Sequence, residues 1–74
     1  MKVIARKEFS IIRIKKGLSL TQLAEQMQVN PSVVSKMEKQ QPVRPATAKK
    51  ACMALNESFE TLFTIENQEV KEHE

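Results

Sequence analysis

The chain has 74 residues, a net charge of +3, a single Cys, and no Trp or Tyr. This length allows one domain, one Cys excludes an intrachain disulfide, and no apolar run reaches the roughly 18 to 20 residues of a membrane span. Residues 1–56 hold eleven Lys or Arg and three Glu, a net charge of +8, whereas residues 57–74 hold one Lys and six Glu, a net charge of −5. The basic part of the chain suits a polyanionic ligand. The alternative is that these charges only form a solvated surface.

Residues 1–5, MKVIA, are short and rich in β-branched side chains, so we expect either an ordered strand or a frayed end. Near the other terminus, Phe63, Thr64 and Ile65 alternate between apolar and polar, which is the pattern of a half-exposed strand.

The first helix is predicted from Lys7 to Lys16, with Phe9 and Ile12 on its inward face. Gly17 follows, and it can take the left-handed conformation that ends a helix. Ile11 and Ile14 do not share the phase of the inward face. They either pack under the N-terminal segment or form a contact surface, and the pattern does not decide between these.

The second helix follows Ser19, whose side chain can cap the free N–H groups of the first turn. Its apolar stripe has the spacing i, i+3, i+4, i+7 and consists of Leu20, Leu23, Ala24 and Met27. Gln28 and Val29 interrupt the stripe, so we expect a turn there.

The third helix begins at Asn30 and Pro31, a favoured N-cap followed by a residue suited to the first helical position. Val34 and Met37 point to one side of this helix. The opposite face is small, polar and basic and is formed by Ser32, Ser35, Lys36 and Lys39. Two short helices joined by a tight turn, with such an outer face on the second, are typical of a helix-turn-helix.

The remaining chain predicts a polar loop from Lys39 to Arg44, then a helix that starts at Pro45 and ends near Asn56. Its apolar stripe consists of Ala48, Ala51, Cys52 and Leu55, so Cys52 is expected to be a buried small side chain. A short fifth helix capped by Ser58 follows, and its bulky residues are Phe59, Leu62 and Phe63.

The stretch GLSLTQLAEQMQVNPSVVSKMEKQ resembles the helix-turn-helix of the lambdoid phage repressor and Cro family (XRE type). The resemblance runs from about Phe9 to Phe63, and its matching parts are Gly17-Leu18, Leu23-Ala24, Val29, Val34 to Glu38, Arg44-Pro45 and Ala48 to Leu55. It implies an all-α fold, a compact five-helix bundle, for a domain of residues 1–66. Residues 67–74, which include His73, are expected to be a charged, disordered tail.

The resemblance also implies two structural links. Lys2–Ala5 would pair with Phe63–Ile65 in a short terminal β-ribbon, with two loose ends as the alternative. Arg13 would form an ion pair with Glu38 that orients the third helix, with two solvated charges as the alternative. The family usually has a Gly near Gln40, so the path of that loop stays open.

By the same resemblance the third helix enters the major groove of double-stranded DNA. The base-proximal residues would be Pro31, Ser32, Val33 and Lys36, with Lys36 the best candidate for a guanine. Contacts to the DNA backbone would come from Ser19, Thr21, Ser35, Lys39 and Arg44. The family usually places a Gln where this chain has Leu20, so that phosphate contact is expected to be lost.

These features predict a sequence-specific DNA-binding regulator, a repressor that reads a near-palindromic operator as a dimer formed at least on DNA. The family usually dimerises near the region Asn56 to Phe63, where Phe59 is the candidate contact and a plain core residue is the alternative. An antitoxin or anti-regulator that mainly binds another protein is the competing function.

We expect no enzyme, no cofactor and no metal site, because the chain has no nucleophile–base pair, phosphate loop or metal-ligand cluster. The first nine residues, MKVIARKEF, hold no apolar run as long as a signal sequence. We therefore expect a cytoplasmic protein.

Overall fold

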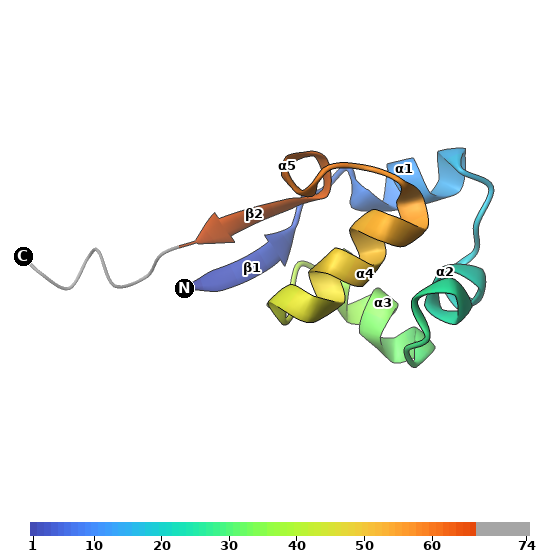
Figure 1. The fold of residues 1–74 in the computed structure, drawn as a ribbon, viewed down its shortest axis with the longest axis horizontal. Coiled ribbons are helices and arrows are strands. Elements are labelled where there is room, and N and C mark those ends of the chain that lie inside the picture. The colour runs from blue at the N-terminus through green and yellow to red at the C-terminus, as the bar shows by residue number, and fades with distance from the viewer. Residues whose placement is uncertain (67–74) are drawn as a thin grey trace, which may run out of the picture.

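The computed structural model describes residues 1–66 (Figure 1). The predicted disorder of the tail and the expectation for His73 concern residues outside this range. The elements follow one another as β1 (Lys2–Ala5), α1 (Phe9–Lys15), α2 (Leu20–Met27), α3 (Pro31–Glu38), α4 (Pro45–Leu55), α5 (Phe59–Leu62) and β2 (Phe63–Glu66). The prediction of a five-helix bundle with a helix-turn-helix is confirmed.

Polar caps set the start of three helices. At α2 the Ser19 hydroxyl accepts from the Gln22 N–H at 3.1 Å, and the Gln22 side chain accepts from the Ser19 N–H at 2.8 Å, which is a reciprocal capping box. At α3 and α5 the capping is one-sided: the side-chain oxygens of Asn30 and Ser58 accept from the backbone N–H groups of Ser32 and Thr61. Asn56 ends α4 with a left-handed backbone, as predicted.

Helix α1 begins at Phe9, two residues later than predicted. The Arg6 N–H donates to the Leu62 carbonyl at 2.8 Å, so the backbone pairing between the N-terminal and C-terminal segments continues as far as Arg6. The Phe9 N–H then donates to the Arg6 carbonyl at 3.0 Å and forms a turn. Pairing of the termini therefore delays the helix.

Two antiparallel strands join the ends of the domain. Val3 lies opposite Ile65 and Ala5 lies opposite Phe63, so the predicted terminal ribbon is present. Phe63, which we had also placed in the fifth helix, has an extended backbone and belongs to β2. The ribbon is supported from the helical body, because the rings of Phe9 and Phe63 pack edge to face with centroids 5.7 Å apart.

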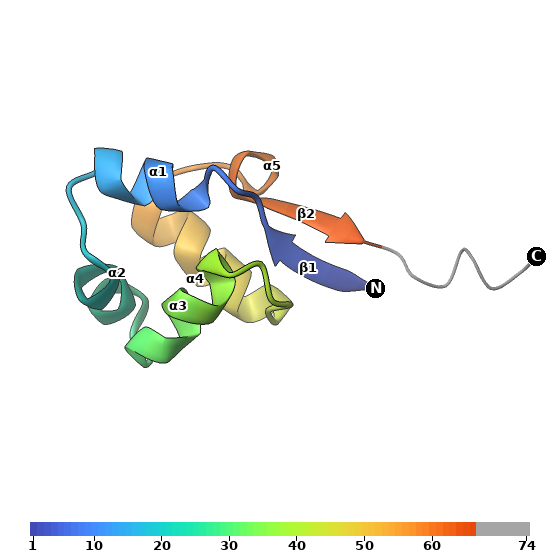
Figure 2. The ribbon, with the colours of Figure 1, turned by 180° about the vertical axis from the view of Figure 1, so that it is seen from behind.

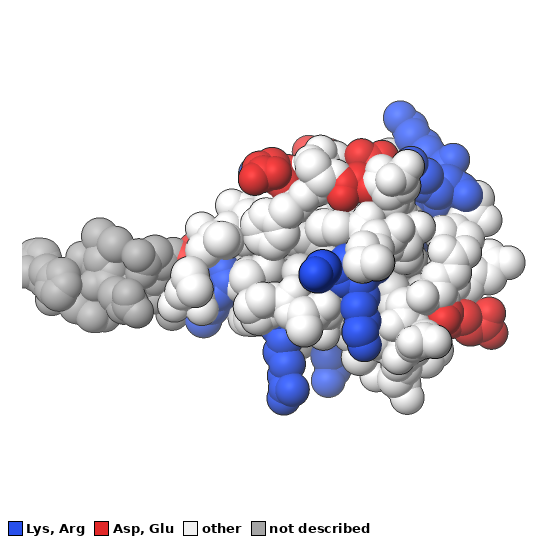
Figure 3. All heavy atoms as spheres, viewed as in Figure 1, with Lys and Arg blue, Asp and Glu red and all other residues white. Residues whose placement is uncertain are grey.

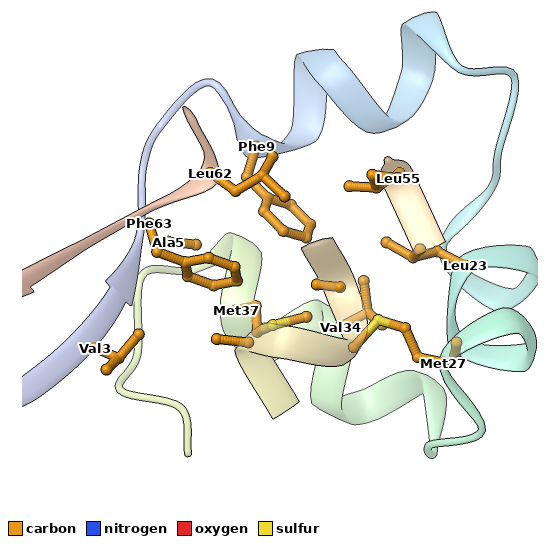
Figure 4. Packing of buried hydrophobic residues seen from close by; sticks show 13 residues of the cluster. Val3, Ala5, Phe9, Leu23, Met27, Val34, Met37, Leu55, Leu62 and Phe63 are labelled. Atoms are coloured by element: carbon orange, nitrogen blue, oxygen red, sulfur yellow. The ribbon is translucent and has the colours of Figure 1, made fainter. Parts of the chain in front are cut away.

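The helices enclose one apolar core, to which both strands contribute (Figure 4). Its largest fully buried side chains are Phe9, Phe63, Leu23, Met37, Leu55, Leu62 and Val34. From behind, α2 and α3 lie along the lower side of the bundle, α1 and α5 lie along the upper side, and α4 runs between them (Figure 2). This arrangement leaves the outer face of α3 open on one side of the molecule.

Ile11 and Ile14 remain 53% and 61% exposed. The N-terminal segment does not cover them, because it forms β1 and pairs with β2. Of the two sequence-based alternatives, packing under that segment is therefore wrong.

Candidate nucleic-acid interface

Helix α3 has one anchored face and one open face. Val34 and Met37 have no exposed surface and hold the helix in the core. On the other side Pro31, Ser32 and Lys36 are exposed. These are three of the four predicted base-proximal residues. Pro31 and Ser32 begin the helix, the part that reaches deepest into a major groove, and Lys36 lies one turn further on.

Val33 and Ser35 are half-buried rather than fully presented. Val33 keeps part of its apolar surface open next to Lys36, which suits contact with a methyl group. Ser35 lies beside the exposed face and is partly covered by the body of the protein. The structure therefore presents Val33 and Ser35 less fully than the three exposed residues.

The turn between α2 and α3 depends on Gln28. This residue ends α2 with φ 61° and ψ 44°, a left-handed conformation that favours Gly. Its N–H and that of Val29 donate back to the last carbonyls of α2, so the turn is hydrogen-bonded as well as tight. Sequence reasoning recognised the break in the stripe but did not predict a left-handed residue, because Gln carries no signal for one.

The start of α2 is exposed at Ser19 and Thr21, the two backbone-contact candidates there. The Ser19 hydroxyl oxygen is occupied as the cap acceptor, which leaves its hydrogen available to donate to a phosphate. Leu20 packs against the core, so it offers no polar replacement for the Gln that the family usually has.

The loop after α3 is tied to β1. The Val43 N–H donates to the Val3 carbonyl at 2.9 Å, and the Gln40 side-chain amide reaches the Ala5 carbonyl at 3.4 Å. Gln40 itself has φ 65°, so it takes the left-handed conformation that a Gly would take there. The N-terminal strand thus holds the loop that leads to Arg44.

A shallow groove lies between α3, the loop that follows it and the start of α4. It is lined by Val33, Lys36, Pro42, Val43, Arg44 and Thr47. It brings together Lys36 and Arg44, which are eight residues apart in the chain. Ser19 and Thr21 are not part of it. Sequence reasoning missed Pro42, Val43 and Thr47, although Thr47 stands in the first turn of a helix directly after Arg44.

Arg13 and Glu38 form a forked ion pair between α1 and the end of α3. Arg13 Nε lies 2.6 Å from Glu38 Oε2, and its Nη2 lies 3.2 Å from Oε1. The remaining nitrogen, Nη1, donates to the Leu18 carbonyl at 2.7 Å. The two side chains are only 11% and 15% exposed, so the pair is shielded from water and holds α1, α3 and the α1–α2 loop together.

Basic side chains cover the α3–α4 side of the molecule. Between residues 36 and 50 the chain has five exposed basic residues, Lys36, Lys39, Arg44, Lys49 and Lys50. The one acidic residue in that stretch, Glu38, is neutralised by Arg13. In Figure 3 blue side chains project from the lower edge, where α3 lies, and red atoms gather along the upper edge near α5; a second blue group stands at the upper right and a second red group at the lower right. This polarity suits a polyanion on the α3 side.

Cys52 is a free cysteine that packs against the core and is half-buried rather than fully buried as expected. Burial raises the pKa of its thiol, and the nearby Glu60 carboxylate raises it further, against a smaller lowering by a backbone hydrogen bond. The thiol is therefore protonated at neutral pH. Within residues 1–66 no group of three or more His, Cys, Asp or Glu is placed to bind a metal, and no helix is long and apolar enough to cross a membrane.

A family model described as helix-turn-helix matches residues 10–62, more than two thirds of the chain. No curated protein matches the chain. The matched segment contains the capped helix α2, the tight turn at Gln28 and the exposed face of α3. The chain belongs to the helix-turn-helix family of the phage repressor type, whose members are DNA-binding regulators of transcription.

Proposed function

We propose that the protein is a sequence-specific repressor that inserts α3 into the major groove of a near-palindromic operator. The single observation that supports this best is the groove in which Lys36 and Arg44 meet beside the exposed face of α3. It combines a side chain suited to base edges with one suited to phosphates, the two kinds of contact that specific DNA binding requires.

In this proposal the face of α3 from Pro31 to Lys36 reads the bases. Lys36 donates to guanine O6 or N7, and Val33 or Pro31 contacts a thymine methyl group. Ser32 is exposed but short, so it contributes weak discrimination. Lys36 is therefore the main specificity residue.

The DNA backbone is held on both sides of α3. Lys39 and Arg44 contact phosphates on one side, with Ser35 as a lesser contributor, and Ser19 and Thr21 contact phosphates at the start of α2. A repressor needs no further chemistry, because a protein bound across an operator blocks access of the transcription machinery to the same DNA.

The test is an unbiased selection of bound sequences from random double-stranded DNA with purified protein. We expect one enriched site with approximate two-fold symmetry and half-sites about one turn, 34 Å, apart. A reporter gene behind this site should be repressed when the protein is present and released by Lys36→Ala. Selection that enriches no sequence would contradict the proposal, and reporter activation would contradict repression alone.

The exposed pair Ile11 and Ile14 favours a second candidate function, that of an antitoxin or anti-regulator that binds another protein. The pair lies on α1, on the upper side of the bundle in Figure 2, whereas α3 lies on the lower side. Changing both residues to Ser should leave DNA affinity unchanged in either case. Only a protein-binding function predicts that this double variant loses its effect in cells.

A further inference from the structure

Strand β1 lies between two segments that are far apart in the chain. Val3 pairs with Ile65 of β2 on one side and forms an antiparallel bridge with Val43 on the other. Adjacent strands are about 4.8 Å apart, so the backbones of Ile65 and Val43 are separated by roughly 10 Å. The end of β2 is therefore close to the loop that leads from α3 to α4 (Figure 1).

The direction of this bridge brings Arg44 to the end of the ribbon at which β2 stops. Because the bridge is antiparallel, Arg44 lies on the Lys2 side of Val43. Lys2 pairs with Glu66, the last residue of β2. The chain that follows Glu66 therefore begins about two strand spacings, roughly 10 Å, from the backbone of Arg44.

The groove beside Arg44 combines positive charge with an apolar lining. Lys36 and Arg44 supply the charge, and Val33, Pro42 and Val43 supply the apolar surface. Neither cation forms an ion pair with a carboxylate of residues 1–66. Within this part of the chain the positive charge of the groove is therefore not neutralised.

The segment after β2 has the complementary composition. Residues 67–74, which lie outside the described range, hold three Glu and one Lys, a net charge of −2. Their one aliphatic residue, Val70, stands directly after Glu69 and two residues before Glu72. Eight residues can span up to about 26–29 Å, which is more than twice the separation of Glu66 from Arg44. This acidic segment can therefore reach the whole groove.

We propose that the acidic segment occupies the groove between α3 and α4 when no DNA is bound, and that it competes with DNA for this site. The inference rests on the proposed function, because it concerns regulation of the same interface. The carboxylates of Glu69 and Glu72 pair with the cations that DNA phosphates and bases need, and Val70 covers the apolar lining. The segment is an intramolecular polyanion that leaves the groove before α3 docks.

This contact is weak enough for DNA to displace it. Ion pairs between exposed side chains are individually weak, and salt screens them. The covalent connection offsets part of this weakness, because a short connection gives the segment an effective concentration on the order of millimolar. Since the segment leaves the groove whichever DNA binds, it lowers the affinity for every sequence by the same factor.

The test compares two charge-neutralising double variants of the full chain. Glu69→Gln with Glu72→Gln removes two carboxylates from the acidic segment. Glu8→Gln with Glu60→Gln is the matched control, because it removes two exposed carboxylates beside α1 and in α5, on the upper side of the bundle in Figure 2. Both variants raise the net charge equally.

The variant of the acidic segment should bind operator and random DNA about 3- to 10-fold more tightly than the wild type at low salt, and this gain should fade as salt rises. The control variant should gain less than about 2-fold, because its carboxylates lie far from the bound DNA. Equal gains would overturn the proposal, since net charge alone would then explain them. Absence of a gain in the first variant would overturn it as well.

A second comparison shows whether the segment acts through the groove. Arg44→Gln removes a cation that holds the acidic segment, so in this background the gain from Glu69→Gln with Glu72→Gln should be much smaller than in the wild type. Lys50→Gln is the control background, because Lys50 is an exposed cation of α4 that does not line the groove. There the gain should be retained. An undiminished gain in the Arg44→Gln background would overturn the proposal.

A measurement without DNA keeps this inference separate from the proposed function. If the segment lies in the groove, Glu69→Gln with Glu72→Gln should shift the amide NMR signals of Val43, Arg44 and Thr47 and leave those of α1 unchanged. Such shifts in a protein that binds no DNA would retain the contact and reject the proposed function. Unchanged groove signals in a protein that binds its operator would overturn the contact and retain the proposed function.

Discussion

Lys36 and Lys39 are both exposed, yet they stand at different places on α3. Lys36 lines the groove with Val33, whereas Lys39 is the C-cap residue at the end of the helix. In the proposed docking the first would contact base edges and the second would contact the DNA backbone. Their substitution therefore separates specificity from general affinity.

Lys36→Ala should weaken binding to the selected operator by roughly 1–3 kcal/mol and relax the preference at one base position. Lys39→Ala should weaken binding to all sequences about equally. The measurement is the affinity for the operator and for a set of single-base variants at one salt concentration. The reverse pattern would mean that α3 docks in a different orientation.

Gln28 is the second residue with a testable consequence, because its φ of 61° lies in the left-handed region. That region costs a non-glycine residue about 1–2 kcal/mol, and glycine adds about 0.5–1 kcal/mol of folding entropy cost, so the strain is the larger effect. Gln28→Gly should therefore raise the free energy of unfolding in urea by about 0.5–1 kcal/mol.

Gln26→Gly is the matched control for this change, since Gln26 is an exposed residue within the same helix. There glycine should lower the free energy of unfolding by about 0.5–1 kcal/mol. Equal effects of the two substitutions would show that the turn does not strain Gln28.

At the scale of elements, the position of α3 depends on links to elements far away in the chain. Val34 and Met37 bury its inner face, Glu38 joins its end to α1, and β1 holds the loop that follows it. Each link restricts a different motion of the helix. The exposed face of α3 is therefore held by contacts with several elements rather than by the helix–turn contact alone.

The Arg13–Glu38 pair should show strong energetic coupling. Three nitrogens of Arg13 have partners and little of the pair is exposed, so a double-mutant cycle with Ala should give a coupling energy of roughly 2–3 kcal/mol in urea unfolding. Arg13→Lys should recover little of it, because lysine lacks the forked geometry.

The Lys16–Glu57 pair provides the comparison in the same chain. Its atoms are 3.1 Å apart, but its side chains are 37% and 29% exposed. Solvent screening should limit its coupling to the usual 0.2–1 kcal/mol of a surface pair. Similar coupling energies for the two pairs would contradict the structural role assigned to Arg13.

At the scale of the whole molecule, the separation of charge predicts how binding responds to salt. If about five phosphates per subunit are neutralised, log K should fall against log salt concentration with a slope of about −4 to −5 per subunit. The slope is measured by titrating operator DNA with the protein at several salt concentrations, from low to moderate, and determining the binding constant at each. Lys39→Ala should reduce its magnitude by about 1, and a wild-type slope near zero would exclude DNA as the ligand.

The sequence by itself determined the helices and their order, because the signals for them are local. Ser19, Asn30 and Ser58 act on N–H groups within three residues of themselves, and an apolar stripe such as that of α2 repeats within two turns. The same local patterns, with the family resemblance, indicated the exposed face of α3 and the pairing of the termini.

Only the tertiary structure decided how distant segments meet. The groove that joins Lys36 to Arg44, the bond from Val43 to Val3, and the late start of α1 all depend on contacts between residues far apart in the chain or on separate elements. Gln28 and Gln40 take left-handed conformations that their residue type does not favour, because the surrounding packing outweighs a local preference of about 1–2 kcal/mol. Local preferences are individually small, so non-local packing decides wherever the two disagree.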